Sequence, residues 1–377
     1  MRYSVSDLRP EAELIFLGAR RYPDASAQER MLKLLEIDLD WTYIQAQAFH
    51  HDVSSLLYFN LHDIGRERPP AAVMEELEQR FRASALHNLF LLGELLKLVE
   101  ELEQAQIAVI PLKGPVLAIA AFGDVSLREF SDLDLLIHEQ DIGRAQQRLT
   151  ELGFLCTFKA EWLEAYLRFG HELDFASSDG TFSVDLQWRF GKKWLPFPLT
   201  PEALWERSST VQIAGRTVRQ PHPDDYVLLL CGHAYRHCWS RLKWVSDVAA
   251  FIDTFGGQID WEQLLQDVRG SGGLRILGLG LWLARQVCGV RLPNKVIRHL
   301  AADPQIAQLG QGVIDGFLQN TGLMGPRGSA GFVANLRFQL GARERLRDKL
   351  PHIGSLADHA SYQLRRYVRH YTRRLLS

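Results

Sequence analysis

The hydrophobic pattern of the chain changes its period near residue 107, and this change limits the folds that the chain can adopt. Residues 71–105 carry apolar side chains three and four apart with glutamates between them, which is typical of a long amphipathic helix. The segment "IAVIPLKG" (107–114) is instead short and β-branched, and a Gly-Pro breaker follows it. Two further short runs, "LDLLI" (133–137) and "FLCTFK" (154–159), have the length and composition of strands separated by helices. The pattern predicts a small sheet among helices.

A hairpin completes this sheet. The segment "HELDFASSDGTFSVDLQWRF" (171–190) contains two alternating runs around a Ser-Asp-Gly turn. Strands and helices mixed in this order are typical of a small domain with a short mixed sheet. We therefore predict an α+β fold, in which a small mixed-sheet domain is embedded between N-terminal and C-terminal helical regions.

The same patterns divide the chain into four regions. Residues 1–100 are expected to be helical, and residues 101–195 to form the sheet-bearing α/β domain. Residues 196–300 are expected to contain a linker, a small strand pair and a helical domain. Residues 301–377 are expected to form a helical, basic C-terminal region.

Composition excludes several classes of protein. The net charge of −2 over 377 residues favours neither nucleic acid nor a membrane surface as a partner. The four cysteines are scattered without CxxC spacing, which argues against a disulfide framework and against a zinc ribbon. No apolar run approaches the roughly 18 residues of a membrane span, and no signal-peptide core is visible. We expect a cytoplasmic protein with no membrane span.

Two aspartates alternate with leucines where the strand at 133–137 begins. Asp132 and Asp134 share one face of this strand, because side chains two residues apart on a strand point to the same side. Two carboxylates this close repel each other, and one becomes protonated unless a cation lies between them. Oxygen ligands favour Mg²⁺ or Mn²⁺, and Asp185 on a later strand would supply a third carboxylate to such a site. The alternative interpretation of the pair is a solvated strand end.

An anion site is predicted upstream of the aspartates. Gly114 lies at a strand-to-helix turn, where a phosphate can approach the backbone and the free amides of the following helix. Lys113 stands beside this glycine and can neutralise phosphate charge. Arg128 precedes Asp132 by four residues and could reach the same anion.

Three stretches together resemble one known family. "LKGPVLAIAAFGDVSLREFSDLDLLI", "VDLQW" and "HAYRHCWSRLKWVSDVAAFI" are similar to pieces of the bacterial nucleotidyltransferase-like proteins of undefined substrate, within the polymerase-beta-like nucleotidyltransferase superfamily. The resemblance covers most of residues 30–260. It implies that the sheet-bearing domain is a catalytic nucleotidyltransferase domain.

The resemblance also implies a mechanism. Asp132 and Asp134 would bind both of two catalytic metal ions, Mg²⁺ or Mn²⁺, while Asp185 would bind one ion and help to deprotonate the acceptor hydroxyl. The acceptor would attack the α-phosphate of a nucleoside triphosphate, with ATP the first donor to test, and pyrophosphate would leave. The acceptor is not identified and could be a small molecule, a peptide or a protein.

The phosphate turn departs from the superfamily pattern. That turn is usually Gly-Ser or Gly-Gly, whereas this chain has Lys113-Gly114-Pro115, in which proline supplies no amide. Lys113 and Arg128 are therefore expected to take over the anion contacts. Two alternatives follow: a catalytically inactive partner protein of the same fold, or an RNA-modifying or toxin-like transferase that uses the basic segment "YQLRRYVRHYTRRLL" (362–376).

A second cluster, "CGHAYRHCWSRLKWVSD" (231–247), is dense in functional side chains. His233 and His237 are four residues apart, so they share one helix face. One interpretation is a pair of helices packed by aromatic residues. In the other, this segment closes the active site. His233, His237, Arg241 or Lys243 would then contact nucleotide or acceptor, and Trp244 would stack on a base.

Overall fold

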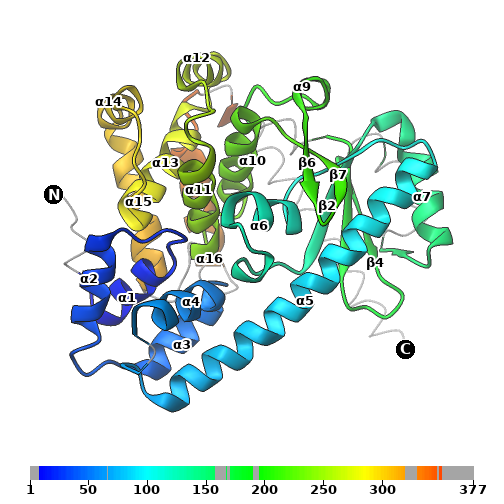
Figure 1. Cartoon of the computed structure of the whole chain (residues 1–377). Coiled ribbons are helices and arrows are strands. Elements are labelled where there is room, and N and C mark those ends of the chain that lie inside the picture. Colours follow the sequence, from blue (N-terminus) through cyan, green and yellow to red (C-terminus); the bar gives the residue numbers. More distant parts are fainter. Residues whose placement is uncertain are drawn as a thin grey trace, which may run out of the picture.

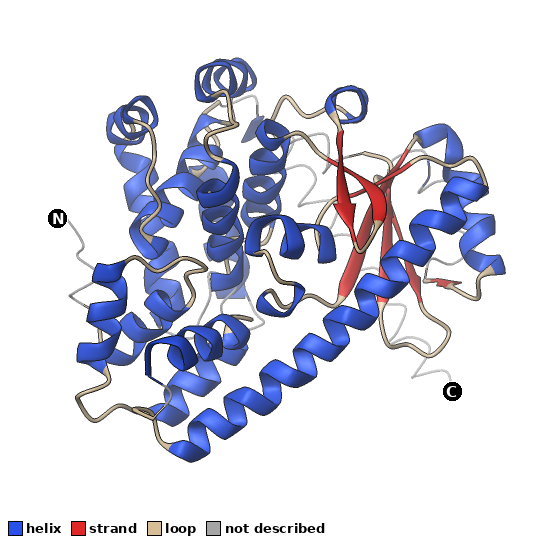
Figure 2. Cartoon of the chain, viewed as in Figure 1, coloured by secondary structure: helices blue, strands red, loops and turns tan. Residues whose placement is uncertain are grey.

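The computed structural model describes residues 8–65, 67–157, 167, 170–189, 195–318, 329–345 and 348–349. Helices fill one side of the molecule and the sheet lies on the other, as the colours of Figure 2 show. The first helices are α1 (Pro10–Gly18), α2 (Ala25–Leu34), α3 (Trp41–His50), α4 (Ser54–Gly65), α5 (Ala71–Gln104), α6 (Pro115–Phe122) and α7 (Ile142–Glu151). The later helices are α9 (Pro201–Arg207), α10 (Pro223–Arg236), α11 (Leu242–Phe255), α12 (Trp261–Ser271), α13 (Leu274–Cys288), α14 (Asn294–Ala302), α15 (Pro304–Leu318) and α16 (Ser329–Gly341).

The sheet has the strand order β1-β2-β5-β4-β3. Its strands are β1 (Val109–Pro111), β2 (Asp132–Ile137), β3 (Leu155–Cys156), β4 (Glu172–Ala176) and β5 (Ser183–Gln187). β2 and β5 run parallel, and the other pairs are antiparallel. The mixed sheet and the predicted hairpin are confirmed, since β4 and β5 pair across a turn in which Gly180 has a φ of +70°. A separate pair, β6 (Ser209–Ile213) and β7 (Arg216–Gln220), confirms the predicted strand pair.

One face of the sheet is apolar. Leu133 on β2, Leu186 on β5 and Leu173 on β4 are buried there in a core shared with α5 and α7. Figure 1 shows α5 crossing this side of the sheet from end to end. The leucines that alternate with aspartates on β2 therefore fix which way the carboxylates point, because every second residue of a strand faces the opposite side.

A second core joins helices from both ends of the chain. Residues of α1–α4 pack in it with residues of α10–α15, and α6 belongs to it through Leu117 and Phe122. The 34-residue helix α5 bridges the two cores, with Met74 in the helical core and Leu98 in the sheet core. The predicted α+β fold is confirmed. The four predicted domain boundaries stay a prediction, although all four regions contribute to one shared core.

Two predicted features lie partly or wholly outside the described part of the chain. Residues 158–159 of the third predicted strand, and the basic segment 362–376, lie outside the described residues. Among the residues that are described, no helix is both long and apolar enough to cross a bilayer. The cytoplasmic location stays a prediction.

Candidate active site

Carboxylates from three adjacent strands share the second face of the sheet. Asp134 on β2 lies opposite Asp185 on β5, and Asp185 lies opposite Asp174 on β4. Asp132 and Glu172 stand two residues from this row on the same face. The structure thus brings together Asp132, Asp134 and Asp185, as their alternation with apolar residues predicts.

Several carboxyl groups on this face have raised pKa values. Burial, together with the neighbouring carboxylates of Asp134 and Asp132, raises the pKa of Asp185 to about 8. Burial also raises the pKa of Asp134, with Asp132 acting in the same direction and Lys113 opposing it. The pKa of Glu172 is raised by burial as well. Such mutual repulsion is what a cation between carboxylates would relieve.

Among the described residues, Lys113 places a positive charge directly at this face. Its Nζ is 2.9 Å from Oδ2 of Asp134, with the two side chains only 13% and 3% exposed. The same Nζ is 3.2 Å from Nδ1 of His233. Burial and the charge of Lys113 hold the pKa of His233 well below its usual range, so its ring is neutral and can accept a hydrogen bond from the ammonium group. Gln187 donates to the other oxygen of Asp134 at 2.9 Å.

The glycine turn lies directly against the first carboxylate strand. Gly114 has φ +59° and ψ −131°, a conformation that strains any residue with a side chain. A Cβ at this position would lie 3.4 Å from the carbonyl oxygen of Asp132. α6 begins at Pro115, as predicted, so the free amides of its first turn are those of Val116 and Leu117. The positive end of α6 is therefore anchored beside the aspartates.

Replacing this glycine tests the turn. Gly114→Ala is expected to lower the free energy of unfolding by about 1–3 kcal/mol, because alanine must adopt a strained backbone conformation. The matched control is Gly143→Ala in α7, where a Cβ meets nothing within 4 Å and helix propensity favours alanine by about 1 kcal/mol. Urea unfolding of both variants measures the difference, and equal stabilities would contradict the strained turn.

Arg128 lies in a different environment from the one that its position near Asp132 suggests. Its Nε and Nη2 donate to the two oxygens of Asp247 at 2.7 and 2.9 Å, with both side chains almost fully buried. Asn88 donates to the backbone carbonyl of Arg128 at 2.9 Å. The pairing of Asp247 with an arginine fastens the segment before β2 to α11. In this structure the guanidinium of Arg128 is paired with Asp247. The anion contact expected of Arg128 stays a prediction.

The Arg128–Asp247 pair is expected to matter greatly for stability. Arg128→Met leaves the Asp247 carboxylate buried and unpaired, which we expect to cost about 3–5 kcal/mol of unfolding free energy. The double variant Arg128→Met, Asp247→Leu should recover much of that loss, because no charge then remains buried. Arg82→Met, which removes an exposed pair with Glu78, serves as control and should cost less than about 1 kcal/mol. Chemical denaturation measures all three, and additive losses in the double variant would contradict the pairing.

The second cluster divides into two parts. The rings of His233 and His237 lie 4.7 Å apart, which confirms their shared face, and His237 stacks on Trp244 at 5.2 Å. α10 ends at Arg236, so the second histidine lies at the helix end. Arg241 instead donates to the carbonyl of His50 and pairs with Asp52 at 3.4 Å. The structure thus brings His233 to Lys113. His237 and Trp244 pack beside the ring of His233, whereas Arg241 contacts residues at the end of α3 and in the loop that follows it.

Two residues of this site were not predicted. Arg236 reaches the carboxylate face, where its Nη1 lies 3.9 Å from Glu172. Its spacing of three from His233 on a helix was the signal that could have identified it. Gln187 follows Asp185 by two residues on β5 and therefore shares its face.

The side chains on this face offer the oxygen ligands that a hard divalent cation prefers. All three predicted ligands are carboxylates, and burial together with the charge of Asp134 and Asp132 raises the pKa of Asp185. As the side chains stand, no three His, Cys, Asp or Glu residues of the described segments converge on one metal position. The ammonium group of Lys113 lies at Asp134 instead. Metal binding at this face therefore requires Lys113 to move.

Solved structures of nucleotidyltransferases show a partial likeness to the chain. The solution structure of the antibiotic-resistance factor ANT(2'')-Ia is 16% identical, with a TM-score of 0.37 and coverage of 48% of this chain and 93% of that chain. The crystal structure of ANT(2'')-Ia in complex with adenylyl-2''-tobramycin is 15% identical, with a TM-score of 0.36 and coverage of 48% and 98%. An antigenic nucleotidyltransferase-like protein from Paracoccidioides brasiliensis is 18% identical, with a TM-score of 0.34 and coverage of 57% and 98%.

The family is established by sequence. No curated protein matches the chain. The profile of a family described as uncharacterised nucleotidyltransferase matches residues 38–289, which run from α3 to α13 and include the carboxylate face and the second cluster. Because this match covers well over half of its length, the chain belongs to this family of nucleotidyltransferases.

Proposed function

We propose that the protein transfers a nucleoside monophosphate from a nucleoside triphosphate, with ATP the first donor to test, to a hydroxyl of an acceptor. The acceptor could be a small molecule, a peptide or a protein, and pyrophosphate would be released. The observation that carries this proposal is the position of Asp132, Asp134 and Asp185 on one face of the sheet beside the glycine turn at Gly114.

Two Mg²⁺ or Mn²⁺ ions are proposed as cofactors. Asp132 and Asp134 would hold both ions, and Asp185 would hold one of them. Bound there, the ions would stabilise the attacking and leaving oxygens of the transfer. The excess of buried carboxylates over cations on this face supports the proposal.

The chain's own groups would position the substrates. Lys113 would leave Asp134 and pair with the triphosphate. His233 would accept a hydrogen bond from the ammonium group of Lys113 and so hold it near the phosphates. Arg236 lies on the same face, so it could contact the outer phosphates once it leaves Glu172. The positive end of α6, which carries the free amides of Val116 and Leu117, would favour an anion beside Gly114. Positioning and charge neutralisation supply most of the catalysis in such transfers.

Asp185 is the proposed general base. Its carboxylate, which lies opposite Asp134 on the same face, would accept the proton of the attacking hydroxyl. Asp174, one strand further from β2, is not given a role in the reaction.

The fate of a label distinguishes this function from other phosphate chemistry. The protein is incubated with ATP carrying radioactive phosphorus at either the α- or the γ-phosphate, together with small-molecule and protein fractions of a cell extract. Nucleotidyl transfer moves the α-label to an acceptor and leaves the γ-label in pyrophosphate. Transfer of the γ-label to an acceptor would show phosphoryl transfer and contradict the proposal.

A further inference from the structure

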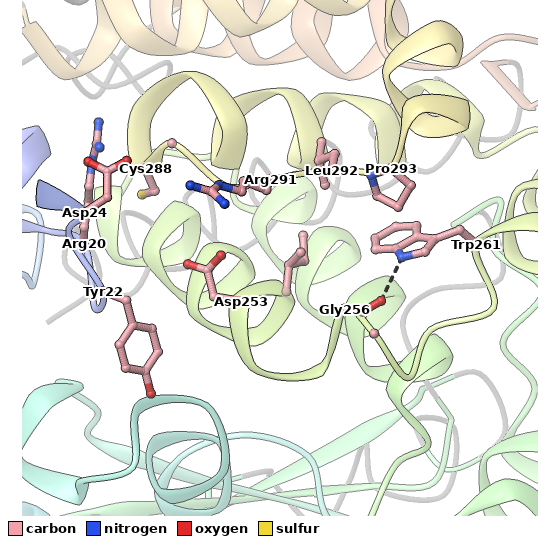
Figure 3. A pocket seen from close by; sticks show the side chains of 13 residues that line it. Arg20, Tyr22, Asp24, Asp253, Gly256, Trp261, Cys288, Arg291, Leu292 and Pro293 are labelled. Carbon is pink, nitrogen blue, oxygen red and sulfur yellow. Dashed lines mark hydrogen bonds between the residues drawn. The ribbon is translucent and has the colours of Figure 1, made fainter. Parts of the chain in front are cut away.

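A cavity lies away from the carboxylate face, between the ends of three helices. Figure 3 shows it bounded by the segment after α1, the end of α11 and the residues that follow α13. Its volume of about 620 Å³ falls within the range of small-molecule sites, which is about 300–1,000 Å³. No residue of the proposed active site lines it.

One end of the cavity is charged. Arg20 is fixed there, because its Nε and Nη2 donate to the carbonyl of Val287 at 3.2 and 3.0 Å. Asp253 and Arg291 face the same space in Figure 3, and within the described part of the chain neither makes a hydrogen bond or an ion pair. The surrounding atoms desolvate the Asp253 carboxylate enough to raise its pKa to about 6, although Arg20 and Arg291 act in the opposite direction. Asp24 also lines the cavity, and Asp253 and Arg291 are exposed, so cations and carboxylates border one accessible space.

The other end of the cavity is apolar. The indole of Trp261 is held in place by a hydrogen bond from its Nε1 to the carbonyl of Gly256 at 3.0 Å. Pro293 lies beside Trp261 in Figure 3, and Ile252 and Leu292 add apolar surface to the lining. Figure 3 shows Trp261 at the opposite side of the cavity from Arg20. A ligand that spans the cavity would thus meet charge at one end and apolar surface at the other.

We propose that this cavity binds a small zwitterion, namely an α-amino acid with an apolar side chain. Its carboxylate would pair with Arg20 and Arg291, its ammonium group with Asp253, and its side chain would lie against Trp261. A ligand with a charge of one sign would leave the opposite protein charge desolvated and unpaired, which is unfavourable. An uncharged apolar ligand would leave both the arginines and Asp253 desolvated without a partner.

The cavity is separated from the proposed catalytic turn by α6. Arg21 donates to the carbonyl of Phe122 at 2.6 Å, and Thr254 donates to that of Ala121 at 3.1 Å, so residues next to the cavity lining in sequence hold the C-terminal end of α6. Gly114 precedes the other end of this eight-residue helix, which is about 12 Å long at 1.5 Å per residue. Binding in the cavity is therefore expected to be independent of the carboxylate face.

Calorimetry on the full chain tests the proposal. L-Leucine, L-phenylalanine and L-tryptophan are titrated beside their N-acetyl and amide derivatives, each of which lacks one of the two charges. At least one free amino acid should bind, and its blocked forms should bind about tenfold more weakly or worse. Arg291→Met and Asp253→Asn should each weaken binding to a similar degree. Arg285→Met, an exposed arginine of α13 outside the cavity, should leave it unchanged.

The variants also separate this site from the active site. Asp132→Asn should leave amino-acid binding intact even where nucleotide binding is lost. Thermal melting of each variant checks that it is folded. No binding of any free amino acid at about 10 mM, equal binding of the blocked forms, or binding unaffected by both Arg291→Met and Asp253→Asn would overturn the proposal.

Discussion

Asp132→Asn is expected to lower the rate of pyrophosphate release during nucleotidyl transfer by about 10³-fold, the scale on which loss of one electrostatic contact to a transition state acts. The substitution removes a proposed ligand of both ions while keeping the shape of the side chain. Its thermal stability should not fall, because Asp132 adds to the repulsion that raises the pKa of both Asp134 and Asp185. Pyrophosphate release and melting temperature are measured on the same preparation.

Asp174→Asn provides the matched control for this variant. Asp174 is also a carboxylate of the same sheet face, and its pKa is likewise raised by burial, but it lies one strand further away, opposite Asp185. It should retain transfer within about tenfold of the wild type, since it is not a proposed ligand. Full activity of Asp132→Asn, or equal losses in the two variants, would contradict the assignment of the metal ligands.

Lys113→Met is expected to change two properties in opposite directions. Without the ammonium group 2.9 Å from Asp134, the free protein should bind Mn²⁺ about tenfold more tightly or better, because a unit charge at this range contributes several kcal/mol at an effective dielectric constant near 20. Transfer should fall by about 10²-fold or more, since the proposed partner of the triphosphate is gone. Manganese binding to the free protein at pH 8.5 and pyrophosphate release measure the two effects.

Lys243→Met is the control for the lysine. Its Nζ pairs with Asp52 at 2.8 Å in the second cluster, away from Asp134. This variant should leave manganese binding by the free protein unchanged. Weaker manganese binding in Lys113→Met than in wild type would show that Lys113 supports metal binding rather than competing with the metal ion for Asp134.

Local patterns in the sequence were enough to predict the elements that carry the site. The alternation of Asp132 and Asp134 with leucines defined both a strand and its two faces, because the leucines had to be buried. Proline after Gly114 marked the start of α6, and Asp179-Gly180 marked the hairpin. Each of these signals involves residues a few positions apart, which is the range over which propensity and periodicity act.

The partners of the charged side chains could not be predicted in this way. Arg128 stands four residues from Asp132 in sequence, yet it pairs with Asp247, which lies 119 residues away. Lys113 and His233 meet across 120 residues. The packing of α6 and its flanking segments against α10 and α11 decides these contacts, and no local pattern records which helix faces meet.

Calorimetric titration of ATP, GTP, CTP and UTP, each with and without Mg²⁺, into wild type, Asp132→Asn and Asp174→Asn tests the central claim most directly. We expect at least one triphosphate to bind wild type and Asp174→Asn only with Mg²⁺, and to lose this metal-dependent binding in Asp132→Asn. Metal-independent binding in all three proteins, or no binding of any triphosphate to the wild type, would contradict the assignment of the carboxylate face as a metal-dependent nucleotide site.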